Sequence, residues 1–188
     1  MAELSGLVPC KLFCSVLAGS VEHVAACEDI LAGRFGPVDL HSATFSFART
    51  AYYEKDMGPG LLRRFLSFAH LVDPERLAEI KILTNELEKS FPRKSGSVSR
   101  PINLDPGLMA RGRMILASTK DFSHRICIGR GIFAEVTLQF KKDQVITLPW
   151  TYPDYATGEY DDFFIRLRRR YHQQLEESKK ILDSQREL

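Results

Sequence analysis

The segments Ser99–Gly107 (SRPINLDPG) and Leu116–Arg125 (LASTKDFSHR) stand where the chain changes from helical to strand-like patterning. A Ser- and Gly-rich connector, residues 93–99, leads into them, and apolar or alternating runs follow. Between their apolar residues the two segments carry Asn, Asp, Lys, His and Arg side chains. Because such side chains are costly to bury unless they are paired, we expect a polar site here.

The chain before this stretch begins with a β-α-β pattern. Lys11–Leu17 is apolar on both faces, which predicts a buried strand, and the run is too short to span a membrane. Ser20 is suited to cap the helix that follows, and glycines and a proline at 33–37 end that helix. In Asp39–Phe47, mostly apolar residues alternate with serines and a threonine, and this alternation predicts a second strand.

A helical excursion is predicted at about residues 58–92. Leu61–Leu71 has the apolar content of one helix, and Asp73 followed by Pro74 marks the start of another. One face of this second helix is apolar. Three polar residues lie on the adjoining face, spaced four and then three apart, and we interpret them as a solvated surface: Lys81, Asn85 and Glu88.

Strands dominate the second half of the chain. Met114–Ala117 and Phe133–Phe140 predict strands, and Lys141–Gln144 predicts a hairpin turn. A long amphipathic helix is predicted at about residues 160–184. This order of elements indicates a single α+β domain over residues 1–188, with a mixed, largely antiparallel sheet covered by helices in a two-layer sandwich. A doubly wound α/β sheet is the alternative.

The composition is that of a soluble protein. Of the 188 residues, 44% are hydrophobic and 27% are charged, and the formal net charge is +2. This balance creates no global field that favours nucleic acid or an anionic membrane, so RNA is a weaker candidate partner and no membrane association is expected. The four cysteines match no zinc-ligand spacing. We interpret them as reduced and mostly buried, which indicates a cytoplasmic protein.

Five segments, in order along the chain, resemble the domain of unknown function 4416 (DUF4416) family, a group of uncharacterised prokaryotic proteins. They are Phe47–Gly58 (FARTAYYEKDMG), Asn103–Gly107 (NLDPG), Leu116–Arg125 (LASTKDFSHR), Gly131–Leu138 (GIFAEVTL) and Pro149–Tyr155 (PWTYPDY). Leu108 departs from the family pattern, in which an aromatic residue is expected. The resemblance implies that these segments belong together, and it implies no reaction.

Anion binding is the first chemistry that these segments suggest. Arginine binds phosphate or carboxylate through paired hydrogen bonds, lysine adds a point charge, and aromatic rings in loops can stack on a base or a sugar. The loops 49–58, 99–107, 118–125 and 149–155 predict one ligand-binding set: Arg49, Tyr53, Arg100, Asn103, Ser118, Lys120, Arg125 and Tyr155. The sequence supports equally well the alternative that these cations lie on the surface and form ion pairs with nearby acids.

Acid–base catalysis is the second chemistry that these segments suggest. Asp105, Glu135 and His124 are the candidate catalytic residues. Carboxylates beside a bound phosphate are compatible with Mg²⁺, but no D-x-D or H-x-H spacing supports a metal site, and no metal ligand is assigned. For Asp105 the alternative is a structural role, in which it caps a turn made by Pro106 and Gly107.

Two functions follow as hypotheses. The first is a small cytoplasmic enzyme or binder of a phosphorylated or nucleotide-like small molecule, although no G-x-x-x-x-G-K-[ST] phosphate loop is present. The alternative is a non-catalytic module that binds RNA or a protein through the aromatic loops and the arginines of residues 166–170. The sequence does not decide between enzyme and binder, and it indicates neither a cofactor nor an oligomeric state.

Overall fold

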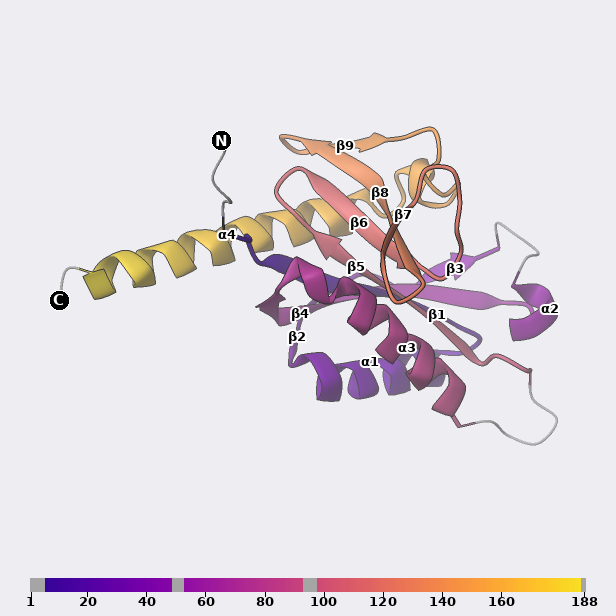
Figure 1. Cartoon of the computed structure of the whole chain (residues 1–188). Coiled ribbons are helices and arrows are strands. Elements are labelled where there is room, and N and C mark those ends of the chain that lie inside the picture. The colour runs from indigo at the N-terminus through magenta and orange to yellow at the C-terminus, as the bar shows by residue number, and fades with distance from the viewer. Residues whose placement is uncertain (1–5, 49–52, 93–97, 187–188) are drawn as a thin grey trace.

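The structure is a computed structural model that describes residues 6–48, 53–92 and 98–186. Within these ranges nine strands form one open sheet, accompanied by four α-helices (Figure 1). The α+β class and the largely antiparallel sheet expected from the sequence are thereby confirmed.

The strands are β1 (Cys10–Ala18), β2 (Val38–His41), β3 (Phe45–Phe47), β4 (Leu61–Val72), β5 (Ile102–Met109), β6 (Arg113–Ser118), β7 (Ile126–Gly129), β8 (Ile132–Lys141) and β9 (Gln144–Thr147). The helices are α1 (Val21–Phe35), α2 (Glu54–Met57), α3 (Leu77–Ser90) and α4 (Asp161–Arg186). Along the sheet the strands lie in the order β2-β4-β1-β5-β6-β8-β7, while β3 pairs with β4 and β9 with β8.

The first half of the sheet is built from two interleaved β-α-β units. β1 and β2 both pair antiparallel with β4, so they run parallel to each other with β4 between them. In the same way β4 and β5 both pair antiparallel with β1. This is the split β-α-β arrangement of ferredoxin-like folds. It contains the β-α-β pattern expected from the sequence, except that the second expected strand, residues 39–47, is divided into the separate strands β2 and β3. Farther along the sheet, β8 and β9 form the hairpin expected at Lys141–Gln144.

The first helix expected within residues 58–92 is instead the strand β4, so that prediction was wrong. β4 pairs with β1 along one edge and with β2 and β3 along the other. Phe65 packs into the core on one face of the sheet and Leu66 into the core on the other. An apolar run of this length suits a buried strand or a buried helix, and pairing along both edges decides between them.

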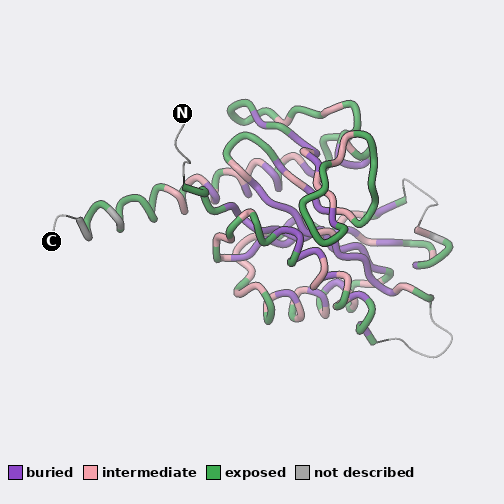
Figure 2. The backbone as a smooth tube through the Cα atoms, in the orientation of Figure 1, coloured by how far each residue is buried: buried purple, intermediate pink, exposed green. Residues whose placement is uncertain are grey.

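Helices cover both faces of the sheet, where a two-layer arrangement was expected. Successive residues of a strand point to opposite faces, and Leu12 and Phe13 of β1 accordingly belong to different hydrophobic clusters. Leu12 packs with residues of α1 and α3, whereas Phe13 packs with the first half of α4. The buried residues lie between these layers (Figure 2).

α4 begins at Asp161, which confirms the predicted long helix. Its buried stripe ends at Tyr171, and beyond that residue the helix is mostly exposed and extends away from the sheet (Figures 1 and 2). Among the helices of the described residues, none combines the length and the apolar character needed to cross a membrane.

Candidate functional site

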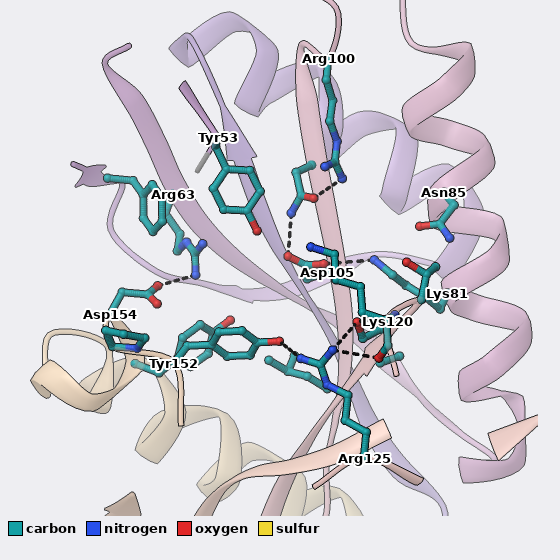
Figure 3. Close-up of a pocket in the computed structure, with 18 residues that line it drawn as sticks. Tyr53, Arg63, Lys81, Asn85, Arg100, Asp105, Lys120, Arg125, Tyr152 and Asp154 are labelled. Carbon is teal, nitrogen blue, oxygen red and sulfur yellow. Dashed lines mark hydrogen bonds and ion pairs between the residues drawn. The ribbon is translucent and has the colours of Figure 1, made fainter. Parts of the chain in front are cut away.

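A cavity of about 470 Å³ opens where β5 and β6 part from each other (Figure 3). The two strands pair only over Gly107–Met109 and Met114–Leu116, and the ladder stops next to Pro106. Proline has no N–H with which to continue such a ladder. The first half of β5 therefore borders the cavity, and β4, α3, the turn after β6 and residues 152–155 supply the other walls.

Lys81 on α3 and Asp105 on β5 form the centre of the site. The Lys81 Nζ donates to Asp105 Oδ1 at 3.0 Å and to the carbonyl oxygen of Leu104 at 2.8 Å, while Asn103 Nδ2 donates to Asp105 Oδ2 at 2.6 Å. Burial raises the pKa of Asp105, but the Lys81 ammonium and these hydrogen bonds outweigh it, so that the pKa lies below its usual value. The carboxylate is therefore ionised at neutral pH.

Glu88, two turns after Lys81 on α3, holds Arg100 at the cavity. Arg100 donates to Glu88 Oε2 from Nε at 3.1 Å and from Nη2 at 2.7 Å, and its Nη2 also contacts Asn103 Oδ1. Glu88 Oε1 accepts a hydrogen bond from the Leu104 amide at 2.8 Å. The predicted solvated face of α3 was therefore wrong, because β5 docks against it and buries Lys81 and Glu88.

Arg125 reaches the cavity from the loop between β6 and β7. Its Nε donates to Glu135 Oε2 at 2.8 Å, and its Nη2 donates to the Tyr152 hydroxyl at 2.7 Å. Its Nη1 donates to Ser118 Oγ at 3.1 Å and to the Lys120 carbonyl oxygen at 2.9 Å. These contacts from four different residues fix the orientation of the guanidinium group.

Arg63 on β4 is a further cation of the cavity that was not predicted from the sequence. Its Nη1 donates to Asp154 Oδ2 at 2.6 Å, and its guanidinium carbon lies 4.4 Å from the centre of the Phe47 ring, in cation–π contact. Because residues 61–71 were predicted to form a helix, Arg63 was not expected to line a site. An arginine inside a strongly apolar run is the signal that points to it, because such a residue needs a partner when it is buried.

Seven of the eight residues predicted to bind a ligand line this one cavity: Tyr53, Arg100, Asn103, Ser118, Lys120, Arg125 and Tyr155. The eighth, Arg49, lies outside the described residues. The side chains labelled in Figure 3 come from distant segments and point toward a common space. Lys81, Asn85 and Asp154 also line it.

The segment 99–107 was predicted to be a loop, but most of it belongs to β5. Its turn-forming residues, including Pro106 and Gly107, pair with β1, so they do not make the turn that Asp105 was suggested to cap. Pairing along the whole of β1 outweighs the local preference of these residues for a turn.

Of the three predicted catalytic residues, only Asp105 lines the cavity. Glu135 is buried, and its Oε2 lies 2.7 Å from His124 Nε2. The same oxygen accepts the hydrogen bond from Arg125 Nε. The His124 ring stacks on Trp150 with 5.3 Å between ring centres. The catalytic roles of Asp105, Glu135 and His124 all stay predictions. Among the described residues, no three His, Cys, Asp or Glu side chains are grouped so that they could hold a metal ion.

The fold and the site define a small α+β protein with a cavity lined by five cations, two carboxylates and several aromatic rings. The chain belongs to the domain of unknown function (DUF4416) family, whose sequence model matches residues 8–171. The matched region contains all the residues of the cavity described above. Comparisons with curated proteins and with solved structures gave no match.

Proposed function

We propose that this protein binds a small phosphorylated, nucleotide-like molecule in the cavity between β5 and β6, as a ligand or as a substrate. The observation that carries the proposal is the convergence of five cationic side chains on one cavity: Arg63, Lys81, Arg100, Lys120 and Arg125. Arginine and lysine in a partly desolvated pocket favour phosphate and carboxylate groups.

Two buried acids support this proposal because they hold arginines without lining the cavity. Glu88 and Glu135 are only 9% and 4% exposed, and they fix Arg100 and Arg125 respectively. Their carboxylates thus orient the guanidinium groups while the cavity wall keeps its cationic character. Preorganised charges of this kind bind a ligand at a lower cost in side-chain ordering.

The rings and the size of the cavity support an organic ligand. Phe47, Tyr53, Tyr152 and Tyr155 line it beside the cations and provide apolar surface for a base or a sugar. A cavity of about 470 Å³ lies within the range of small-molecule sites, roughly 300–1,000 Å³.

The alternative function, binding of RNA through α4, has less support. Arg166 and Arg169 pair with Asp162 and Asp143, and Arg170 pairs with Asp39. Arg168 donates to two backbone carbonyl oxygens. These arginines do not line the cavity, where cations and aromatic rings surround a common space. A cytoplasmic location in a prokaryotic cell is also part of the proposal, and it is supported by the free thiols of all four cysteines.

Thermal unfolding in the presence of phosphorylated compounds tests the proposal. We expect nucleotides or sugar phosphates to raise the Tm, whereas their dephosphorylated counterparts do not, since a ligand that binds only the folded state stabilises it. Lys120→Gln at the cavity should weaken binding about tenfold. The matched control is Lys89→Gln, an exposed lysine of α3 that does not line the cavity. Equal behaviour of the two variants, or no stabilisation by any phosphorylated compound, would overturn the proposal.

A further inference from the structure

The cavity contains hydrogen-bond acceptors as well as cations. The Asp105 side chain is 29% exposed, although it lies on a strand whose neighbours are buried. Lys81 and Asn103 each donate to one of its oxygens. A carboxylate has about four lone-pair positions, so it can accept further hydrogen bonds from a molecule in the cavity.

Asn85 lies one helical turn after Lys81 on α3 and also lines the cavity. In the part of the chain that the structure describes, its half-buried side chain makes no hydrogen bond to any protein group. Figure 3 shows it projecting from α3 on the side of the cavity where Lys81 and Asp105 meet. A side-chain amide offers two donors and an acceptor, which suits a group that both donates and accepts.

We propose that the ligand is a phosphate ester of a sugar or another polyol, whose hydroxyl groups hydrogen-bond to Asp105 and Asn85 while its phosphate meets Lys120 and Arg125. This inference rests on the proposed function and names the ligand class more closely. A hydroxyl group donates to a carboxylate and can also accept from an amide, so the hydroxyl groups of a polyol suit both residues.

Other ligand classes fit this part of the cavity less well. A second anionic group placed here would meet the carboxylate of Asp105 and be repelled by it. A purely apolar group would desolvate Asp105 and Asn85 without replacing their hydrogen bonds to water, which is costly. Sites that hydrogen-bond a substrate hydroxyl discriminate strongly against the analogue that lacks it.

Glycerol 3-phosphate and propyl phosphate test the inference, because they share a phosphate and a three-carbon chain and differ in two hydroxyl groups. Calorimetric titration of both probes, with ribose 5-phosphate as a larger polyol, gives the affinities. We expect the wild type to bind glycerol 3-phosphate at least about tenfold more tightly than propyl phosphate. In Asn85→Ala this ratio should fall severalfold, and in Glu86→Ala, an exposed neighbour on the same helix, it should be kept.

The outcomes separate this inference from the proposed function. Equal affinity for glycerol 3-phosphate and propyl phosphate, or an unchanged ratio in Asn85→Ala, would overturn the hydroxyl recognition alone. If Lys120→Gln left the affinity of every phosphorylated probe unchanged, the anion site itself would be wrong. Thermal unfolding of Asn85→Ala shows whether the variant is folded. Because no described residue hydrogen-bonds to the Asn85 side chain, we expect the Tm of the variant to stay near that of the wild type.

Discussion

The ammonium of Lys81 lies 3.0 Å from Asp105 Oδ1 and is almost fully buried, so one ion pair joins α3 to the middle of β5. The same ammonium donates to the Leu104 carbonyl oxygen at 2.8 Å, which ties the helix to the strand backbone as well. Through Asn103, the pair is linked to Arg100 and Glu88. One hydrogen-bonded network thus connects the core packing of α3 to the wall of the cavity.

Replacing Lys81 by methionine should destabilise the protein. Lys81→Met keeps much of the side-chain volume but leaves Asp105 without its counter-ion. We expect a loss of about 2–3 kcal/mol in the free energy of unfolding. This loss is smaller than for a fully buried ion pair because the Asp105 side chain keeps some contact with solvent. Urea unfolding measures the loss. Lys89→Met, at an exposed position of the same helix, serves as the control and should change stability little. Similar unfolding curves for both variants would contradict the buried ion pair.

The lowered pKa of Asp105 predicts how stability depends on pH. A carboxyl group whose pKa is lower in the folded than in the unfolded state stabilises the fold above its unfolded value, about 3.9, and this contribution disappears as the pH falls through the folded value. The stability difference between the wild type and Asp105→Asn should therefore be constant above about pH 5 and shrink in more acidic solution. Urea unfolding across a pH series measures it. A difference that stays constant down to pH 2 would show that the pKa is not lowered.

Gly107 should tolerate no side chain. A Cβ at this position would lie 2.5 Å from Phe13 Cζ and 2.6 Å from the Ile115 carbonyl oxygen, so Gly107→Ala must displace a core ring and a neighbouring strand. We expect it to cost about 1–3 kcal/mol in thermal or urea unfolding. Gly112→Ala is the matched control, since the nearest atom to its added Cβ, the Phe140 carbonyl oxygen, is 4.0 Å away. Equal stability of the two variants would refute the close approach.

Glu135 should act as a positioning residue for Arg125. Glu135→Gln retains the size of the side chain but removes the charge that holds Arg125 Nε at 2.8 Å. We expect about three- to tenfold weaker binding of a phosphorylated ligand, measured by calorimetry. Asp143→Asn removes an exposed acid that pairs with Arg169 on α4, and it should leave the affinity unchanged. An unaltered affinity in folded Glu135→Gln would exclude the positioning role.

Cysteine accessibility provides a direct check of the fold. Cys127 on β7 is exposed, whereas Cys10, Cys14 and Cys27 are buried, and burial raises the pKa of each of these three thiols. Because the thiolate is the reactive form, one thiol should react with Ellman's reagent in the native protein and all four in denaturant. Cys127→Ser should remove the native reaction. More than one fast-reacting thiol in the native state would argue against the burial of β1 and α1.

Periodicity located most of the elements because it reflects local geometry. The alternation of Phe133–Phe140 identified β8, and the stripe through Phe164 and Tyr171 identified α4. The crowding of polar residues near Asp105 also pointed to the cavity, since a buried polar group needs a partner wherever that partner lies. The same reasoning failed for Leu61–Leu71, whose apolar residues fit both a helix and a strand until β1 and β2 pair with it.

By itself, the sequence determined the α+β class, several strands such as β1 and β8, the terminal helix, and a set of polar residues that had to find partners. Only the tertiary structure decided which partners these were. Arg63 and Asp154 are 91 residues apart, and Lys81 and Asp105 are 24 apart. Local pattern cannot pair such residues, because their contact depends on how the sheet orders its strands and on where β5 separates from β6 to leave the cavity.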